Sequence, residues 1–530
     1  MREMKDSGYS WLGKIPSSWK IKKVKHCFHR KNEKVMQNNP VVLSLARSGV
    51  KVRDISNNEG QIAESYFNYN PVDVDDILLN PMDLYSGANC SISKVKGVIS
   101  PAYINLKALE GVNPGFFDYY FKVQYWLMAF FSYGKGVSFE NRWTLNAEIL
   151  MNYPLLVPEY SEQCKIKKYL DEKCSKIDVV IEKQKQIIEK LETYKVSVIT
   201  EAVTKGIYNE QKMKESGIEW IGMIPQRWSI HKFCWDYSAE LGKMLDAKRI
   251  TGNYLHPYIK NIDVQWDSIN FENLDEMDFE ESEHARYGVK PGDLMICEGG
   301  EIGKCAIVPT DAPVGIYYQK ALHRVRPRDK KKGNIRFLFY IMFTMAKNGC
   351  LNTSPEKATI AHLPGDALSQ LRIPTPPIKE QKQIAEYLDK KCKAVDVKIN
   401  AKNKLIKKLQ DYKKSLIYEC VTGKKEVPVQ PDAFSKTGIN PAVLEQIRNH
   451  AKSCGIHKVI LFGSRARGTF HRDSDIDLAV SGGNVDLFRL AVEEETDTLL
   501  TYDVVNLDRT SNEELLDVIR KEGVIIYEEV

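Results

Sequence analysis

Two stretches of the 530-residue chain carry mostly apolar side chains at spacings that alternate between four and three residues. The first stretch runs from Leu170 to Val198, and the second runs from Leu388 to Leu416. This heptad pattern predicts long helices that each present one apolar seam. No proline interrupts either stretch, whereas prolines lie shortly before both of them, where helices naturally begin. About 40 residues of helix would extend about 60 Å at about 1.5 Å per residue.

Both seams are interrupted by polar residues at the same two places, Gln184 and Lys402 at one, Lys195 and Lys413 at the other. Polar residues in a seam cost stability but can fix the register and the partner of a helix. Heptads sustained over this length favour a coiled coil. Two helices that simply cover domain cores are the alternative.

The whole chain also repeats itself. The block Tyr169–Thr204 returns at Tyr387–Thr422 with an offset of 218. An N-terminal motif returns with an offset of 209, so the second divergent stretch is nine residues longer than the first. The motif residues are Met4, Lys5, Ser7, Gly8, Trp11, Gly13, Ile15, Pro16 and Trp19, which return as Met213, Lys214, Ser216, Gly217, Trp220, Gly222, Ile224, Pro225 and Trp228.

The divergent stretches, residues 20–155 and 229–372, carry many short apolar runs typical of mixed α/β structure. Each contains a similar phrase, Val72–Leu79 in the first and Val289–Ile296 in the second, followed by a glycine-containing loop. The phrase predicts a turn and then a buried strand. Constant ends around a divergent middle indicate one scaffold that presents two different surfaces.

Charge is unevenly distributed along the chain. Lys436–Val530 holds 11 basic and 17 acidic residues, and subtraction from the totals of 76 and 70 leaves 65 basic and 53 acidic residues before it. A basic body can face a polyanion, whereas the acidic tail is not expected to. The 11 cysteines include no Cys-x-x-Cys pair, which favours reduced thiols in the cytoplasm over disulfides or a zinc site. No apolar run is long enough to span a membrane, and no signal peptide is expected.

Residues 1–425 resemble the specificity subunits of type I restriction–modification systems. The resemblance is carried by the two Trp-x-Gly-x-Ile-Pro motifs, the phrase Gly292-Asp293-Leu294, and the spacer ends Glu201–Thr204 and Glu419–Thr422. It implies two target recognition domains that each read half of a bipartite, asymmetric site in double-stranded DNA. It further implies antiparallel spacer helices, docking of two methyltransferase (M) subunits, association with restriction (R) subunits, and S-adenosylmethionine bound by partner subunits only.

Base edges carry sequence information, and cations on phosphates supply affinity that is independent of sequence. The candidate DNA contacts are therefore basic residues expected in loops, for each of which an ordinary solvated surface position is the alternative. They are Arg47, Lys51, Arg53, Lys94 and Arg142 in the first arm, and Arg249, Lys260, Lys304, Arg324 and Arg326 in the second. Asn80–Asp83 departs from the amino-methyltransferase motif at its third and fourth places, and Gly299–Cys305 is too short for a phosphate-binding loop.

The tail holds a catalytic constellation. A predicted buried strand, Lys458–Phe462, leads into Gly463, Ser464, Arg465 and Arg467, and Asp475 and Asp477 then alternate on a second strand and point to one face. Asp503 supplies a third acid on another strand. Three carboxylates can bind Mg²⁺ for an in-line transfer, while the Gly463-Ser464 backbone and Arg465 or Arg467 hold the phosphates of a nucleotide.

Residues 437–530 resemble the minimal nucleotidyltransferase domains of the DNA polymerase beta superfamily, which include antitoxins paired with helical toxins. The Gly-Ser turn, the following Arg-Gly and the Asp-x-Asp about ten residues on carry the resemblance. It implies catalytic and metal-binding roles for Asp475, Asp477 and Asp503, Mg²⁺ and a nucleoside triphosphate, expected to be ATP, as cofactors, and a toxin or another macromolecule as the acceptor. A degenerate domain kept for docking is the alternative.

The sequence thus predicts an α+β multidomain chain with two α/β target recognition domains, two long antiparallel coiled-coil helices and a small C-terminal α/β nucleotidyltransferase domain. Two other hypotheses stay open: an enzyme that modifies a protein or RNA end and is targeted by the DNA-binding body, and a coiled-coil scaffold without a DNA role. The expected domains are recognition domains 1–155 and 207–373, spacers 156–206 and 374–424, a linker 425–436 and the nucleotidyltransferase domain 437–530.

Overall fold

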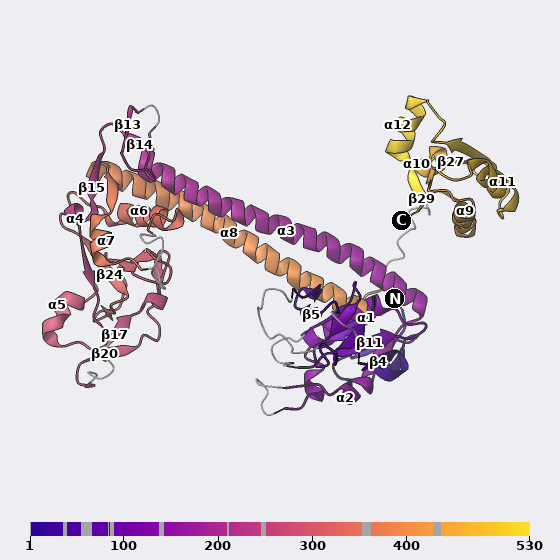
Figure 1. Cartoon of the computed structure of the whole chain (residues 1–530), viewed down its shortest axis with the longest axis horizontal. Coiled ribbons are helices and arrows are strands. Elements are labelled where there is room, and N and C mark those ends of the chain that lie inside the picture. The colour runs from indigo at the N-terminus through magenta and orange to yellow at the C-terminus, as the bar shows by residue number, and fades with distance from the viewer. Residues whose placement is uncertain are drawn as a thin grey trace. The chain divides into compact units, whose positions relative to one another are not determined.

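The computed structural model describes residues 2–529 apart from 35–39, 55–65, 83, 85–88, 137–142, 209–210, 245–250, 352–361 and 428–435. The chain divides into two units, which are described separately here. Residues Met1–Tyr169 with Tyr418–Val530 form one, and Leu170–Ile417 form the other. Figure 1 labels the helices and strands of both.

The first recognition region is a set of short strands with two short helices, followed by a long helix. The elements are β1 Met4–Asp6, β2 Lys14–Pro16, β3 Lys20–Lys23, β4 Phe28–Lys31, β5 Leu43–Ala46, β6 Gly49–Val52, β7 Asn70–Val72, β8 Ile77–Leu79, β9 Cys90–Ile92, β10 Gly97–Ile99, β11 Ile104–Ala108, α1 Pro114–Trp126, α2 Ala147–Met151, β12 Pro154–Val157 and α3 Tyr160–Lys205. Its largest sheet has the strand order β4-β11-β8-β9.

The second recognition region has the same plan with additional strands. The elements are β13 Met213–Glu215, β14 Met223–Pro225, β15 Ser229–Lys232, α4 Phe233–Asp236, β16 Tyr237–Leu241, β17 Leu255–Ile259, β18 Val264–Gln265, β19 Ser268–Ile269, β20 Glu276–Asp278, α5 His284–Tyr287, β21 Leu294–Cys297, β22 Cys305–Ile307, β23 Tyr317–Tyr318, β24 Leu322–Pro327, α6 Ile335–Lys347, α7 Gly365–Gln370, β25 Arg372–Thr375 and α8 Ile378–Val421. Its largest sheet has the order β16-β24-β21-β22, which matches the first sheet strand for strand.

The repeated N-terminal motif forms the same hairpin twice. β1 pairs with β2 in the register Met4↔Pro16, and β13 pairs with β14 in the register Met213↔Pro225. The turn of each hairpin requires a left-handed backbone, because Gly13 and Gly222 both have a φ of +64°. Glycine adopts this conformation at little cost, which explains why the motif keeps glycine there.

Each hairpin is followed by a fully buried tryptophan that anchors the start of a long helix. The indole N–H of Trp19 donates to Glu162 in the first turn of α3 at 2.9 Å, and the indole N–H of Trp228 donates to Glu380 in the first turn of α8 at 3.1 Å. An acid in the first turn also suits the positive end of the helix dipole. The same bond therefore fixes the start of both helices.

The residue after each of these glutamates fixes a second, shorter helix. The side-chain oxygen of Gln163 accepts from the Asn113 backbone N–H at 2.8 Å, and that of Gln381 accepts from the Asn334 N–H at 2.9 Å. Both asparagines are N-caps, and their side chains accept from the backbone of the first turn of α1 and α6. The long and short helices of each region are thus joined through one glutamine.

The two long helices predicted from the heptads are α3, of 46 residues, and α8, of 44 residues. Lys195 on α3 binds Asp396 on α8 at 2.7 Å, and Lys413 on α8 binds Asp178 on α3 at 2.7 Å. The two pairs link residues in opposite chain order, so the helices run antiparallel within Leu170–Ile417, where Figure 1 shows them side by side. Lys195 and Lys413 are the lysines that interrupt the seams, and together they fix the register.

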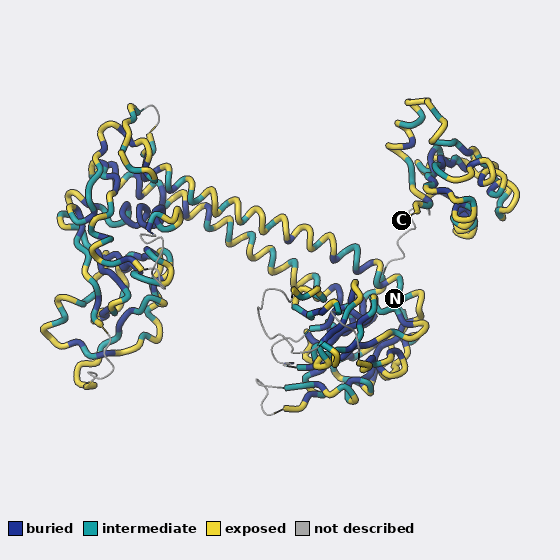
Figure 2. Tube along the Cα trace, in the orientation of Figure 1, coloured by how far each residue is buried: buried dark blue, intermediate teal, exposed yellow. Residues whose placement is uncertain are grey.

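The seam residues are buried or half-buried along both helices, while most other positions are exposed, as Figure 2 shows. At one end of this unit the last turns of α3 enter a large core with the second recognition region. This core contains Ile199, Val203, Trp228, Ile384 and Leu388. The second recognition region is therefore packed against the end of one long helix and the start of the other.

The tail forms a four-stranded sheet with four helices. The elements are α9 Pro441–Ser453, β26 Lys458–Leu461, α10 Gly463–Arg467, β27 Ile476–Ser481, α11 Val485–Glu495, β28 Tyr502–Asn506, α12 Glu513–Glu522 and β29 Val524–Glu528. The strand order is β28-β27-β26-β29, and only β27 and β28 are parallel. Val459, Leu461, Leu478 and Phe488 contribute to its core.

A buried ion pair lies inside the first recognition region. The ammonium of Lys31 on β4 donates to Asp76 at 2.7 Å and to Asp73 at 2.8 Å, and its side chain is 7% exposed. Asp76 is 2% exposed and also accepts from the Asp73 backbone N–H and from Asn105. The two carboxylates share one cation but differ in burial, because the side chain of Asp73 is 50% exposed.

This difference in burial can be tested. We expect Asp76→Asn to lower the free energy of local opening by about 3–5 kcal/mol, because it removes one partner of a buried pair. Asp73→Asn is the matched control and should cost about 0–1 kcal/mol, as exposed pairs do. Hydrogen–deuterium exchange of β8 and β11 in the full chain measures both. Equal effects of the two substitutions would contradict the conclusion that Asp76 forms a buried ion pair and Asp73 an exposed one.

Candidate functional site

Basic side chains of the first recognition region lie mainly at its surface. Arg47 is exposed in the turn between β5 and β6, Lys51 is exposed on β6, and Lys94 is exposed in the turn between β9 and β10. Arg53 is half-buried, and its backbone N–H donates to Val42 at 2.8 Å. Arg142 lies outside the described residues. Arg47 and Lys51 share one hairpin, so these two candidates are held on the same small element.

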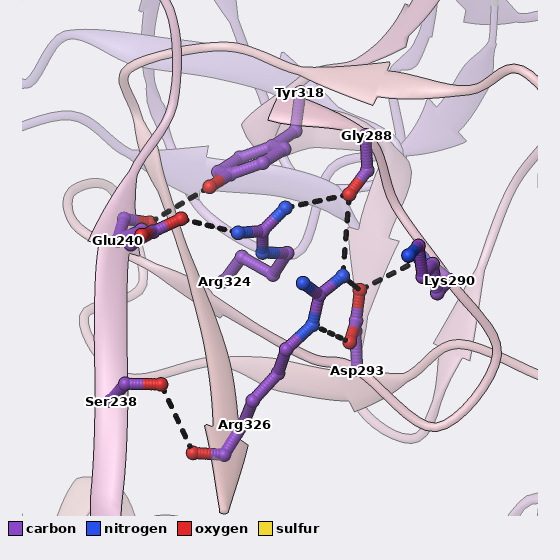
Figure 3. A network of polar contacts seen from close by, with 8 residues as sticks. All are labelled: Ser238, Glu240, Gly288, Lys290, Asp293, Tyr318, Arg324 and Arg326. Atoms are coloured by element: carbon purple, nitrogen blue, oxygen red, sulfur yellow. Dashed lines mark hydrogen bonds and ion pairs between the residues drawn. The ribbon is translucent and has the colours of Figure 1, made fainter. Parts of the chain in front are cut away.

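The structure gives two candidates of the second region a structural role instead. The guanidinium of Arg324 is almost completely buried and binds Glu240 and, at 2.6 Å, the carbonyl of Gly288 (Figure 3). Arg326 holds the carboxylate of Asp293 with two bonds, of 2.5 and 2.6 Å. This burial does not fit the DNA contact that the sequence analysis expected of Arg324, because two of its nitrogens bind protein acceptors inside the sheet. For Arg326, whose side chain is 31% exposed, the bidentate pair is likewise a structural bond.

Comparison of the two regions explains why these arginines bind carboxylates of the protein. Asp293 corresponds to Asp76, because each is the fifth residue of the same sequence phrase and each accepts the backbone N–H three residues before it. Asp76 is neutralised by Lys31 on β4, whereas the matching strand β16 carries Glu240. The second region therefore contains two acids here, and β24 supplies two arginines to balance them.

The remaining candidate DNA contacts of the second region differ in their surroundings. Lys260 binds Asp275 at 2.7 Å, which also raises the pKa of the Lys260 ammonium, mainly through this hydrogen bond. Lys304 is half-buried directly before β22, and Arg249 lies outside the described residues.

The three carboxylates of the tail lie at the paired ends of two parallel strands. Asp477 on β27 is the direct neighbour of Asp503 on β28, and Asp475 comes immediately before β27. Residues two apart on a strand point to the same face, so all three carboxylates share one face. Burial raises the pKa of the Asp477 carboxyl, and the charges of Asp503 and Asp475 raise it further. The negative charges of Asp475 and Asp503 therefore repel that of Asp477.

Gly463 brings the backbone of the preceding turn directly against this cluster. Its φ is +73°, and a Cβ placed there would lie 2.0 Å from Oδ2 of Asp477. Any other residue would be strained by its backbone and would also displace the carboxylate. The glycine of the Gly-Ser turn is thus required by the approach of the turn to Asp477.

Arg465 does not point toward a nucleotide, contrary to the expectation from the sequence. It is 1% exposed, and it donates to the carbonyls of Ser474, Asp475 and Thr437 at 2.7–3.1 Å. Its guanidinium also lies over the ring of Phe470. Since Ser474 and Asp475 lead into β27, Arg465 is a positioning residue for the carboxylates.

Arg467 is the cation of this turn that remains accessible. Its side chain is 44% exposed and binds Glu522 on α12 at 2.8 Å. Its charge lowers the pKa of Asp477, against the larger effects that raise it. The hydroxyl of Thr501, which the sequence analysis did not single out, donates to Asp475. Within the described residues no group of three or more His, Cys, Asp or Glu side chains is arranged to hold a metal ion.

Two family models match parts of the chain. Residues 239–409 match the type I restriction modification DNA specificity domain, and residues 445–530 match the polymerase beta nucleotidyltransferase family. The first match covers most of the second recognition region and α8, and the second covers most of the tail.

Individual relatives extend the similarity to the first half. The chain is 24% identical over 369 residues to the type I restriction enzyme MjaVIII specificity subunit of Methanocaldococcus jannaschii, which covers 67% of this chain and 80% of that protein. It is 25% identical over 294 residues to the putative MjaX specificity subunit of the same organism, covering 54% and 63%. A chain from a solved type I R–M system assembly shares the fold, with a TM-score of 0.59 at 16% identity over 78% of this chain and 99% of that one.

Two further properties concern the cysteines and the helices. All 11 cysteines lie in the described residues, and none forms a disulfide there. Among the helices in the described ranges, none combines the length and apolar character that crossing a bilayer would need.

The repulsion at Asp477 predicts a gain in stability when its charge is removed. A folded-state pKa above the ordinary aspartate value of about 3.9 means that ionised Asp477 destabilises the fold, increasingly as pH rises through that range. We expect Asp477→Asn to slow hydrogen exchange of β27 in the full chain at pH 7, and this gain to vanish below about pH 4. Asp473→Asn, an exposed neighbour, is the control. Faster exchange of β27 at pH 7 in Asp477→Asn would contradict the repulsion.

Proposed function

We propose that residues 2–425 act as the DNA-specificity subunit of a type I restriction–modification complex and read a bipartite, asymmetric site in double-stranded DNA. The observation that carries this proposal is the duplication: two recognition regions with one strand order are anchored to antiparallel helices by the same Trp–Glu bond. Their loops and charge networks differ, so one scaffold presents two readers. Two unlike readers on one scaffold suit two unlike half-sites.

The spacing between the half-sites follows from the length of the helices. We propose that α3 and α8 act as an antiparallel coiled-coil spacer, since half-site spacing in DNA-binding proteins follows from protein geometry. The pairs Lys195–Asp396 and Asp178–Lys413 then set this length by preventing the helices from sliding past each other.

Chemistry on DNA belongs to other subunits in this proposal. The helices offer docking surfaces to two methyltransferase subunits, which bind S-adenosylmethionine and flip the target base. Restriction subunits associate with the same complex. Arg47, Lys51, Arg53 and Lys94 remain first-arm candidates for DNA contacts, with Lys304 in the second arm, because their positions leave them accessible or partly so.

Removing one heptad from each helix tests the role of the spacer. Deletion of 184–190 together with 401–407 leaves both Lys–Asp pairs aligned and shortens the helices by about 10 Å, or about three base pairs. We expect the gap in the methylated bipartite motif to shorten by about three, read from the methylome of cells that carry the complete system.

A variant with the same two segments replaced by other heptads of equal length is the control and should keep the gap. An unchanged gap in the deletion variant would refute the spacer role. A methylome without a bipartite motif would refute the specificity function itself.

We propose that the tail is a Mg²⁺-dependent nucleotidyltransferase that uses ATP or another nucleoside triphosphate. The positions of Asp475, Asp477 and Asp503 on one face of the paired strands support this proposal, because carboxylates are the hard oxygen ligands that Mg²⁺ prefers. A bound ion would have to draw these side chains together, since they are not arranged around a common point without it. Bound Mg²⁺ would neutralise these carboxylates and the phosphates. The Gly463-Ser464 turn lies against Asp477 and offers backbone N–H groups to the nucleotide, and Arg467 supplies a positive charge.

In the proposed reaction a hydroxyl of a protein or RNA end attacks the α-phosphorus of the nucleotide. The bond between the α-phosphorus and the bridging oxygen breaks, and pyrophosphate leaves. A carboxylate of the cluster accepts the proton of the hydroxyl. Arg465 keeps Ser474 and Asp475 in place during this step. A toxin or another protein is the expected acceptor, and the role of the tail in this proposal is regulatory.

Removal of two carboxylates tests this activity. We expect Asp475→Asn plus Asp477→Asn to abolish transfer of label from α-labelled nucleoside triphosphate to co-expressed neighbouring gene products, because too few charges remain to hold Mg²⁺. Asp473→Asn should transfer at the wild-type rate, and the methylated DNA motif should be the same in both variants. Transfer that survives in the double variant would refute the assignment, and absence of transfer by the wild type would favour a docking role.

A further inference from the structure

The middle of α8 is strongly basic. Between residues 390 and 408 this helix has eight lysines and a single acid, Asp396. The carboxylate of Asp396 is already taken by Lys195. The lysines are Lys390, Lys391, Lys393, Lys398, Lys402, Lys404, Lys407 and Lys408.

The duplicated copy of this segment on α3 has a different charge. Residues 172–190, which correspond through the offset of 218, contain five lysines and four acids. Where α8 has Lys390, Lys404 and Lys407, α3 has Glu172, Gln186 and Glu189. The two copies kept their seams but diverged on their outer faces, so the excess of positive charge is a property of α8 and not of the duplicated helix.

The lysines of the two helices also differ in their surroundings. On α3, Lys176 binds Glu172 at 2.7 Å and Lys185 binds Glu182 at 3.6 Å. On α8, five exposed lysines occupy the three positions of the heptad that lie farthest from the seam residues, which places them on the face opposite the seam. We call Lys390, Lys393, Lys404, Lys407 and Lys408 the α8 lysine face. Within the described parts of the chain none of the five has an ion-pair partner.

We propose that the α8 lysine face contacts the phosphates of the DNA segment that lies between the two half-sites. This inference rests on the proposed DNA-specificity function. The face extends over 18 residues, or about 27 Å, which matches about eight phosphates along one strand. A row of like charges on a stiff helix suits a partner with regularly spaced opposite charges, and it adds affinity without reading sequence.

The consequence is a division of labour between the helix surfaces. The α8 lysine face binds the gap segment whatever its sequence, as a spacer must. The mixed outer face of α3 stays available for protein partners. Lysine suits this task because its flexible ammonium is a point charge that needs no fixed geometry on the phosphate.

A matched pair of triple variants of the full chain tests the proposal. Lys404→Gln, Lys407→Gln and Lys408→Gln change the α8 lysine face, and Lys183→Gln, Lys185→Gln and Lys190→Gln remove the same charge from α3. Glutamine is a good helix former, so circular dichroism should show equal helix content in both. Binding to a 40-base-pair duplex of random sequence is measured by fluorescence anisotropy between about 50 and 200 mM salt.

We expect the slope of log K against log salt to become shallower by about 2–3 in the α8 variant, at about 0.9 for each lost phosphate contact. The α3 variant should keep the wild-type slope. Equal changes in the two variants, or no change in either, would overturn the proposal. So would an α8 variant that keeps the slope but no longer co-purifies with methyltransferase subunits, because the face would then bind protein.

Failure of the proposed α8 contact can be distinguished from failure of the proposed specificity function. If the wild type showed no sequence preference among genomic fragments but the α8 variant still lost slope, the specificity function would fail and the α8 contact would stand. If the preference were present and the slope unchanged, only the α8 contact would fail.

Discussion

The bond between a buried indole and the first turn of a long helix sets the geometry of this protein. Trp19 and Trp228 are both fully buried, and each donates to a glutamate at the start of its helix. The next residue along, a glutamine, holds the cap of the short helix α1 or α6. Two consecutive side chains therefore fix both the direction of the long helix and the position of the recognition region against it.

The duplicated regions show how such a scaffold can diverge without losing its fold. The buried carboxylates Asp76 and Asp293 occupy equivalent positions, yet one is balanced by a lysine from the first strand of its sheet and the other by Arg326 from the second. Burial of an unpaired charge is costly, so a region that lacks the lysine of the first sheet must balance its buried aspartate with another cation, which Arg326 supplies. Each region satisfies this rule with different residues, which leaves its surface free to change.

The sequence predicted the elements whose signal is local. Heptad spacing located both long helices, and the alternation of Asp475 and Asp477 placed them on one face, because these patterns depend only on the geometry of one segment. The sequence could not predict that Arg324 and Arg465 are buried. Their burial depends on acceptors that come from distant segments, Glu240 and the loop before β27, and no periodicity in one segment reveals such partners.

Buried carboxylates in this chain have two kinds of neighbours. Some are paired with cations of the protein, and one lies beside other acids. Asp76 and Asp293 are buried with cations supplied by the fold, so they need no further partner. Asp477 is instead held beside two other acids, and its pKa is raised by burial and by their charges. A fold gains nothing from such repulsion, whereas a site that binds a cation does, because binding relieves the repulsion and adds to affinity. The carboxylate of Asp477 therefore differs from those of Asp76 and Asp293 in having like charges as neighbours, which is the arrangement that a proposed cation would relieve.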